Sequence, residues 1–521
     1  MKLANYLAGQ WVTGRGDGIP LIDPVRGTEL VRVSSDGVDY RAALDHARSL
    51  GGPGLRALTY AERAKMLERI AQTLSARREE YYQVAVENSG SSRSDSMIDI
   101  DGAIFTLKYF ARLGSSLGSA RCLRDGDTTS LARDDAYQTL HIGVPLKGVA
   151  VLINAFNFPA WGLWEKAAPA LLSGIAVLVK PASATAWLAQ EMVKDVIEAS
   201  ILPNGALSIS CGRAGDLLDH VEGTDAVLFT GSAQTAQQIR SHPAIATRSA
   251  RVNIEADSLN AAVLGPDATG SAAITQHFVR EVVREMTVKA GQKCTAIRRI
   301  LVPEALLHPV SEALREQLAR VIVGDPRKPQ VQMGPLVSLD QKRAVQHATS
   351  ALASESTIVF SGEDTSIEAE DPRAGAFVMP VLLRNESPLA ARELHAIEAF
   401  GPVATIMPYR EPTDAIQLAA MGRGSLVCSL FTDDATCIES AALEMAADHG
   451  RVHLVTTESA SVQTGHGNVM PMSNHGGPGR AGGGQELGGL RALRLFHQFS
   501  AVQGSPAALR AVGERTALLR P

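Results

Sequence analysis

Three residues of this 521-residue chain combine a reactive side chain with a position where such side chains can act. Cys294 follows a Gly-Gln-Lys run and precedes an expected strand, Glu255 is the last residue of another, and Asn157 follows a third. A thiolate is a nucleophile, a carboxylate can accept a proton, and a side-chain amide can donate hydrogen bonds. Open α/β sheets place ligand-binding groups at the carboxyl ends of their strands. The three residues therefore indicate a candidate active site, although a cysteine taken alone is more often a small buried hydrophobe.

A fourth segment suits a nucleotide. Phe229-Thr230-Gly231-Ser232 joins an expected strand to a helix, and a helix N-terminus attracts the negative charge of a pyrophosphate. Residues 477–482 formally match G-x-G-x-x-G, but they close no expected strand, and Pro478 would not open a helix among so many glycines. We interpret this stretch as a flexible loop. No P-loop pattern supports NTP hydrolysis.

The elements that must position these residues alternate in type. Short apolar runs and helical segments follow one another after Gly148, which predicts parallel strands with crossover helices and hence a doubly wound α/β unit. Thr59 and Glu62 form a capping box that begins an amphipathic helix extending to about Glu87. The expected strands are 149–154, 175–180, 207–211, 226–230, 251–255 and 299–302, with helices near 162–173, 186–200, 213–221 and 232–242. Residues 260–470 repeat the alternation less regularly, and 131–142 are expected to form a hairpin outside the first sheet.

Length and charge exclude several classes of protein. A chain of 521 residues exceeds what one hydrophobic core usually supports, so we expect two or three domains. The net charge of −5 disfavours a nucleic-acid surface. The most apolar stretch, 167–179, is too short to span a bilayer, and the N-terminus lacks a secretory signal. We therefore expect neither a nucleic-acid nor a membrane partner.

The cysteines and histidines predict neither a disulfide framework nor a metal site. The five cysteines, at 122, 211, 294, 428 and 437, form no C-x-x-C pair and have no regular histidine partner. The histidines lack metal-ligand spacing, and we expect His466 and His475, in glycine-rich surroundings, to lie on the surface or in loops. Free thiols suit a reducing compartment, so we expect a cytoplasmic protein.

Short motifs that follow one another along nearly the whole chain resemble the aldehyde dehydrogenase superfamily. They are the segments around Asn157, Phe229, Glu255 and Cys294, together with 179–182, 202–205, 334–338, 398–403 and 486–488. Each is weak alone, and their shared order carries the resemblance. It implies a Rossmann-like NAD(P)-binding domain at 1–125 and 144–256, a catalytic domain at 257–465, and oligomerisation elements at 126–143 and 487–521.

The resemblance also implies catalytic roles. Cys294 would attack an aldehyde to give a thiohemiacetal and then a thioester. Asn157 and the backbone N–H of Cys294 would form an oxyanion hole, and Glu255 would activate water and help to deprotonate the thiol. Lys166 and Glu486 match a pair thought to pass protons toward solvent, although Lys166 could equally be a helix-surface lysine. An activated Cys294 should have a pKa below about 8.5.

A nicotinamide cofactor is implied as well. In many relatives that prefer NAD, a glutamate stands three positions after the residue matching Lys180, and here that position is Ser183. Serine removes the repulsion against a 2′-phosphate while Lys180 supplies a cation, so we expect NADP to be preferred, with NAD as the weaker alternative. The expected cofactor contacts are Asn154, Ala155, Phe156, Lys180, Ser183, Gly215, Phe229, Gly231, Ser232, Ala256, Glu398 and Phe400.

Residues 156–166, 255–260 and 464–472 resemble one narrow branch of the family. It includes the dehydrogenase half of the phenylacetate ring-opening enzyme and a semialdehyde dehydrogenase of aerobic benzoate degradation. The former carries a hydratase domain after its dehydrogenase part. None follows here before Pro521, so we expect the stand-alone type, whose substrate is 3,4-dehydroadipyl-CoA semialdehyde. Phe158, Trp161 and Trp164 could wall an apolar passage to Cys294, with helix–sheet core as the alternative for Trp164.

Other functions stay open at this point. The aldehyde could be the phenylacetate-pathway CoA semialdehyde or a general medium-chain aldehyde. A CoA-acylating dehydrogenase is disfavoured because that chemistry needs no base such as Glu255, and a non-redox thioesterase or structural protein on the same fold is disfavoured by the complete set of reactive residues. The hairpin and the C-terminal segment match the family's oligomerisation elements, which suggests a homodimer.

Overall fold

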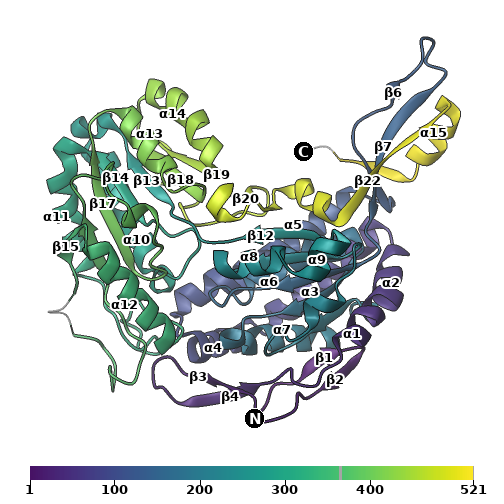
Figure 1. Cartoon of the computed structure of the whole chain (residues 1–521), viewed down its shortest axis with the longest axis horizontal. Coiled ribbons are helices and arrows are strands. Elements are labelled where there is room, and N and C mark those ends of the chain that lie inside the picture. Colours follow the sequence, from purple (N-terminus) through teal and green to yellow (C-terminus); the bar gives the residue numbers. More distant parts are fainter. Residues whose placement is uncertain (363–365, 520–521) are drawn as a thin grey trace.

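The computed structural model describes residues 1–362 and 366–519 and shows two α/β bodies, each built on its own seven-stranded sheet (Figure 1). The first sheet has the order β12-β11-β8-β9-β10-β1-β2. Its five parallel strands are β8 (Val149–Ile153), β9 (Ala176–Lys180), β10 (Leu207–Ile209), β11 (Ala226–Thr230) and β12 (Arg251–Glu255). The short strands β1 (Asn5–Leu7) and β2 (Gln10–Val12) extend one edge in antiparallel pairing.

This strand order confirms the predicted doubly wound arrangement. In the parallel part of the sheet, the chain forms β8 in the middle and then β9 and β10 on one side. It next crosses to the other side of β8 and forms β11 and β12. The order reverses between β8 and β11, and ligands of such folds bind outside the carboxyl ends of the strands at this point. Asn157 follows β8, Gly231 and Ser232 follow β11, and Glu255 ends β12. The topology therefore brings candidate residues from three strands to one edge.

Helices cover both faces of the first sheet. Along β8, Ala150 and Leu152 belong to one hydrophobic core, whereas Val149 and Val151 belong to another. The first core is formed with α3 (Tyr60–Ala76), α4 (Arg78–Ser89), α5 (Arg93–Ser116), α6 (Trp161–Ser173) and α7 (Ala186–Glu198). The second is formed with α1 (Tyr40–His46), α8 (Ala233–Arg240) and α9 (Pro243–Arg248). Strands buried on both faces become continuous apolar runs, which is why their positions could be predicted from the sequence.

The second body confirms the predicted α/β alternation after residue 260. Its sheet has the order β15-β16-β17-β14-β13-β18-β19, and β15 (Thr357–Phe360) is antiparallel at the edge. The parallel strands are β13 (Ala261–Leu264), β14 (Arg299–Pro303), β16 (Val381–Arg384), β17 (Val403–Tyr409), β18 (Ser425–Phe431) and β19 (His449–Val455). They pack against α10 (Ala272–Thr287), α11 (Leu307–Leu318), α12 (Leu339–Ala353), α13 (Pro412–Ala420) and α14 (Ala435–Asp448).

A third, smaller sheet projects away from both bodies (Figure 1). The predicted hairpin is confirmed, since β6 (Thr129–Ser130) pairs with β7 (Gln138–Pro145). β7 also pairs along its whole length with β22 (His497–Gly504), and β5 (Cys122–Arg124) and β23 (Thr516–Leu518) complete the sheet. The helix α15 (Pro506–Gly513) lies beside it. The C-terminal segment is therefore tied to the hairpin.

Two predicted helices differ from the observed ones. The helix expected from Thr59 to about Glu87 keeps its capping box but is broken at Arg77, whose φ of −111° and ψ of 13° are not helical. The helix expected over 213–221 is only a short 3-10 turn at Leu217–His220. Gly215 lies in the left-handed region at φ 52°, which stops a right-handed helix from forming there. Within residues 1–362 and 366–519, no helix has the length and apolar character needed to cross a bilayer.

Candidate active site

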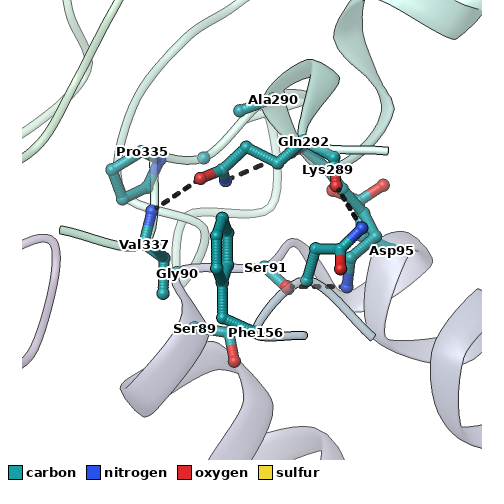
Figure 2. Close-up of a pocket in the computed structure, with 12 residues that line it drawn as sticks. Ser89, Gly90, Ser91, Asp95, Phe156, Lys289, Ala290, Gln292, Pro335 and Val337 are labelled. Carbon is teal, nitrogen blue, oxygen red and sulfur yellow. Dashed lines mark hydrogen bonds between the residues drawn. The ribbon is translucent and has the colours of Figure 1, made fainter. Parts of the chain in front are cut away.

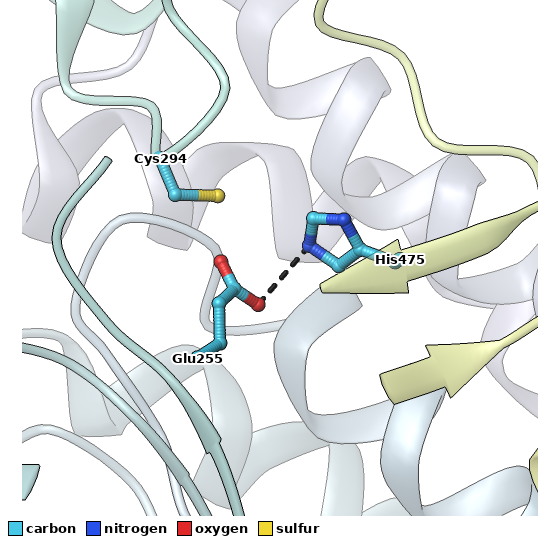
Figure 3. A group of neighbouring side chains, drawn as sticks. All are labelled: Glu255, Cys294 and His475. Atoms are coloured by element: carbon cyan, nitrogen blue, oxygen red, sulfur yellow. Dashed lines mark ion pairs between the residues drawn. The ribbon is translucent and has the colours of Figure 1, made fainter. Parts of the chain in front are cut away.

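Cys294, Glu255 and His475 come together at the carboxyl edge of the first sheet (Figure 3). The Cys294 Sγ, a Glu255 carboxylate oxygen and a His475 ring nitrogen all lie within 4.8 Å of one another. His475 Nε2 is 3.0 Å from Glu255 Oε2. Cys294 lies in the loop that precedes β14, and His475 lies in β20 (Asn474–Gly476), which pairs with β21 (Gln485–Leu487). Three segments distant in sequence thus meet at one point.

The loop before Cys294 is held in an unusual backbone conformation. Lys289, Ala290 and Gly291 all have positive φ values, of 53°, 52° and 68°. Two consecutive non-glycine residues in this region cost energy, so surrounding contacts must fix the turn. Figure 2 shows these contacts: the Gln292 side chain accepts the Val337 backbone N–H at 3.1 Å, and Lys289 Nζ reaches Ser91 Oγ at 3.4 Å. The strained turn therefore sets the position of Cys294.

Asn157 is joined directly to this loop. Its Nδ2 donates a hydrogen bond to the Gln292 carbonyl oxygen at 2.9 Å, so the asparagine lies beside the backbone that presents Cys294. The helix that follows, α6, is capped from another element, because Asp99 accepts the Trp161 backbone N–H at 2.7 Å. The structure thus brings together Cys294, Glu255 and Asn157, while their catalytic roles stay predictions.

The pKa of Cys294 contradicts the sequence-based expectation. Burial raises the pKa of the thiol well above its ordinary value, and the adjacent Glu255 carboxylate raises it further. The prediction of a pKa below about 8.5 is therefore wrong. The charge of the neighbouring Lys293 is engaged elsewhere, because its Nζ forms a buried ion pair with Glu285 at 2.8 Å. A thiol in this setting stays protonated until a base takes its proton.

A cluster of buried charges lies behind Glu255. Lys166 Nζ is 2.9 Å from Glu486 Oε2 and also pairs with Glu165. Asn253 Nδ2 donates to Glu486 Oε1 at 2.9 Å. Lys166 is only 1% exposed, which rules out the alternative of a helix-surface lysine. Burial raises the pKa of Glu165 to about 8, although Lys166 opposes the shift.

Two members of this site are absent from the sequence-based list. Glu165 stands beside Lys166 in a helix that is otherwise apolar on every face, and that surrounding composition could have indicated a buried carboxylate. The expectation that His466 and His475 lie on the surface or in loops is confirmed only in part: His466 lies in a turn, whereas His475 lies in β20, and neither is on the surface, because they are 0% and 3% exposed. The His466 backbone N–H donates to Glu281 at 2.6 Å, and His475 pairs with Glu255. Glycine-rich segments have no hydrophobic periodicity that would reveal such burial.

A mostly apolar cavity of about 320 Å³ leads to Cys294. Phe158 and Trp161 line it, as the sequence predicts, whereas Trp164 is fully buried in the core, which is the alternative stated for it. The opposite wall is α5, and Met97 and Phe105 from this helix are 44% and 37% exposed. The remaining lining residues are Ile98, Asp101, Gly102, Thr106, Lys293, Thr295 and 467–470.

The expected cofactor contacts lie around the point where the strand order reverses. Gly231 has no room for a side chain, since a Cβ would lie 2.5 Å from the Phe229 ring, and Ser232 caps α8. Phe400 from the second body packs edge-on against Phe156, with ring centroids 5.7 Å apart. Lys180 ends β9, and Ala155, Ser183 and Ala256 follow β8, β9 and β12. Gly215 lies in the loop after β10, and Glu398 lies before β17 of the second body.

Asn154 provides a test of whether a polar cofactor fits there. Both polar atoms of its buried side-chain amide lack a hydrogen-bond partner in the part of the chain that the structure describes. A buried amide without a partner costs free energy, and a bound polar group would satisfy it. Burial also raises the pKa of Glu398 to about 7, although its carboxylate accepts the Ser258 N–H at 3.1 Å. The residues present therefore fit a nicotinamide cofactor.

Comparison with known proteins identifies the family. The sequence model of the aldehyde dehydrogenase family matches residues 11–502, so the chain belongs to this family. It is 53% identical over 479 residues to 3,4-dehydroadipyl-CoA semialdehyde dehydrogenase of Aromatoleum evansii, with 92% of this chain and 93% of that protein covered. The chain is accordingly an oxidoreductase of the aldehyde dehydrogenase type with a nicotinamide cofactor.

Solved structures share the fold. A betaine aldehyde dehydrogenase of Staphylococcus aureus in complex with NAD⁺ has a TM-score of 0.82 at 22% identity, covering 96% of this chain and 97% of that one. A 3,6-anhydro-L-galactose dehydrogenase in complex with NAP has a TM-score of 0.83 at 21% identity, covering 97% of this chain and all (100%) of that one. These likenesses confirm the predicted α/β fold with its Rossmann-like part.

Proposed function

We propose that the protein oxidises 3,4-dehydroadipyl-CoA semialdehyde, or a closely similar CoA-linked semialdehyde, to the carboxylic acid with NADP as the preferred cofactor. The observation that carries the chemistry is the meeting of Cys294 and Glu255 at the inner end of an apolar cavity. The likeness to the Aromatoleum evansii protein over 92% of the chain supports the substrate and its place in aerobic benzoate degradation. Formation of NADPH from that semialdehyde, followed spectrophotometrically, tests the proposal.

The residues divide the reaction between them. Glu255 helps to remove the proton of the Cys294 thiol, and the sulfur attacks the aldehyde carbon to form a thiohemiacetal. Asn157 and the Cys294 backbone N–H stabilise the resulting oxyanion. The bound cofactor supplies a hydride acceptor, which leaves a thioester on Cys294. Glu255 then deprotonates the water that cleaves the thioester. Lys166 and Glu486, buried behind Glu255, carry protons away from it.

The cofactor preference rests on Ser183 and Lys180 at the end of β9. Ser183 Oγ donates to the Gly212 carbonyl oxygen at 3.0 Å, so the hydroxyl is fixed and the position carries no negative charge. NAD would be the weaker cofactor. The cofactor itself would be held by the residues at the carboxyl edge of the first sheet, with Glu398 and Phe400 contributed by the second body.

Ser183→Glu should lower the ratio of kcat/KM for NADP to that for NAD by at least about tenfold. A carboxylate 4 Å from a 2′-phosphate charge is disfavoured by about 4 kcal/mol in an effective dielectric of about 20, and solvent reduces this further. Ser183→Gln, of similar size but neutral, is the matched control and should shift the ratio less. A wild-type enzyme that prefers NAD would refute the proposal.

The lining of the cavity predicts which aldehydes are used. It is mostly apolar and includes α5, so linear aldehydes of medium length should be turned over and benzaldehyde poorly. Gly102 lies on this wall, and a Cβ there would only touch Trp161 at 3.5 Å. Gly102→Leu should therefore raise KM for octanal by at least about tenfold while leaving propanal nearly unchanged, because the four carbons of the leucine side chain occupy the passage. Equal effects on both aldehydes would contradict this assignment of the cavity.

Rival functions give different products. An acylating dehydrogenase would make a new acyl-CoA when free CoA and an aldehyde are supplied, whereas hydrolysis gives the free acid. A thioesterase on the same fold would release acid without NADPH. The phenylacetate-pathway semialdehyde and free medium-chain aldehydes are the alternative substrates, and their kcat/KM values relative to the CoA-linked C6 semialdehyde decide among them.

The remaining assignments are also proposals. We place cofactor binding in residues 1–125 and 144–256, and the nucleophile in a catalytic domain at 257–465. Residues 126–143 and 487–521, of which 520–521 lie outside the described residues, would mediate a homodimer, since β6, most of β7, β22 and β23 of the projecting sheet lie in these ranges. Leu131 and Tyr137, between β6 and β7, are 50% and 46% exposed. The protein would work in the cytoplasm, and its five cysteines are free thiols.

A further inference from the structure

His475 is the buried residue in contact with Glu255 that the proposed mechanism does not yet use. We propose that it is a positioning residue for the base: it holds the Glu255 carboxylate ionised and turned so that one oxygen faces Cys294. This inference rests on the proposed function, because it assigns His475 a role in the step that Glu255 performs.

The fold fixes the imidazole from two sides. In the β20–β21 pair, His475 is the direct partner of Glu486, so the two side chains emerge next to each other on one face. The other contact is aromatic, since the Trp161 ring lies 5.8 Å from the imidazole at an angle of 53°. Trp161 is in turn held by the Asp99 cap at the start of α6. His475 therefore has a defined place between Trp161, which lines the cavity, and the buried carboxylate of Glu486.

The two oxygens of Glu255 have different surroundings. Oε2 lies 3.0 Å from His475 Nε2, an ion-pair contact without hydrogen-bond geometry, whereas Oε1 is buried and has no hydrogen-bond partner among the described residues. Figure 3 shows the second oxygen directed toward the Cys294 sulfur, on the side away from the imidazole. Oε2 thus faces the imidazole, and Oε1 is left to accept a proton. Without the imidazole, nothing described here would hold the carboxylate in this rotation.

The charges around His475 favour its protonated form. Glu255 from β12, Glu165 from α6 and Glu486 from β21 face it, and Lys166 from α6 is the one lysine among them. Although burial opposes the charged form, these carboxylates raise the pKa of His475. In return, the imidazolium keeps the pKa of Glu255 low despite burial, with Lys166 contributing less. Removal of the imidazolium should therefore raise the pKa of Glu255.

The sign of the pH effect follows. A base whose pKa is raised is ionised only at higher pH, so His475→Phe should lose deacylation at neutral pH and regain it in alkali. Phenylalanine keeps the aromatic contact with Trp161 but removes the ring nitrogens. His475→Gln keeps a neutral donor and should lie between the wild type and His475→Phe.

The test is a pH series of steady-state and pre-steady-state NADPH formation from hexanal, with melting temperatures to confirm folding. For His475→Phe we expect kcat at about pH 7 to fall at least about tenfold, the loss expected when the pKa of the base lies about one unit above the assay pH, and to recover by about pH 9. The burst amplitude and KM should stay close to the wild-type values. The matched control is His449→Phe, since His449 is also buried but its Nδ1 faces the Met445 carbonyl oxygen instead of a carboxylate. That variant should keep the wild-type pH profile.

Several outcomes would overturn the inference. If both His475 variants keep the wild-type kcat and its dependence on pH on the acidic side, His475 does not position the base. A retained burst would still support the proposed function. If His475→Phe lowers burst and kcat equally at every pH, its effect is not exerted through deacylation. A wild type that forms no NADPH from an aldehyde would contradict the proposed function itself.

Discussion

Replacement of Cys294 by alanine should abolish NADPH formation from any aldehyde, with a loss of more than about 10⁴-fold in kcat. The side chain forms the covalent bond to the substrate, and among the described residues Cys294 is the one cysteine that lines the cavity: Cys211 is buried after β10 and Cys428 is buried in β18. Folding should be nearly unchanged, because alanine only removes one sulfur from a loop whose backbone is held by neighbouring contacts.

Cys428→Ala is the matched control, since it removes a fully buried thiol from β18 and should leave turnover intact. Binding of NADP, measured by fluorescence titration, should be similar in Cys294→Ala and the wild type. Turnover by Cys294→Ala within about tenfold of the wild type would mean that the oxidation does not pass through this thiol.

Glu255→Gln should slow the release of acid much more than it slows the first oxidation. The expected loss in steady-state kcat is about 10²–10⁴-fold, which is the usual contribution of a general base to the rate. A burst of NADPH close to the number of active sites should precede the slow phase. The neutral amide also removes the charge that raises the pKa of Cys294, which partly compensates for the lost proton acceptor in the attack step.

The shape of the progress curve decides between two roles. A full burst followed by slow turnover assigns Glu255 chiefly to deacylation. If the burst disappears together with turnover, thiol deprotonation depends entirely on Glu255, and the proposed division of the reaction is wrong. Rapid mixing with hexanal and NADP, with active sites counted by protein concentration, distinguishes the two.

Much of the fold that positions the site could be predicted from the sequence. β11 is buried on both faces and appears as an apolar run with a sharp end, whereas β12 alternates polar and apolar residues up to Glu255, which ends it. The hairpin expected over 131–142 could also be predicted, because the residues that form its turn lie next to one another in the sequence. Local chemistry of this kind depends only on near neighbours in the sequence.

The properties that were mispredicted depend on long-range contacts. Lys293 is next to Cys294 in the chain but pairs with Glu285, while Glu255 from another strand lies beside the thiol and raises its pKa. His475 lies in a glycine-rich stretch whose pairing with β21 could not be inferred from periodicity. The sign of an electrostatic effect is set by three-dimensional neighbours, and these cannot be deduced from sequence spacing.

The central claim is that the aldehyde carbon becomes covalently attached to Cys294 and that Glu255 releases it. Rapid acid quench of Glu255→Gln after one turnover with hexanal and NADP, followed by peptide mass spectrometry, tests this directly. The account predicts a hexanoyl thioester on the peptide that contains Cys294, in an amount equal to the NADPH burst and absent without cofactor. A full burst with unmodified Cys294, or with the acyl group on another residue, would contradict it.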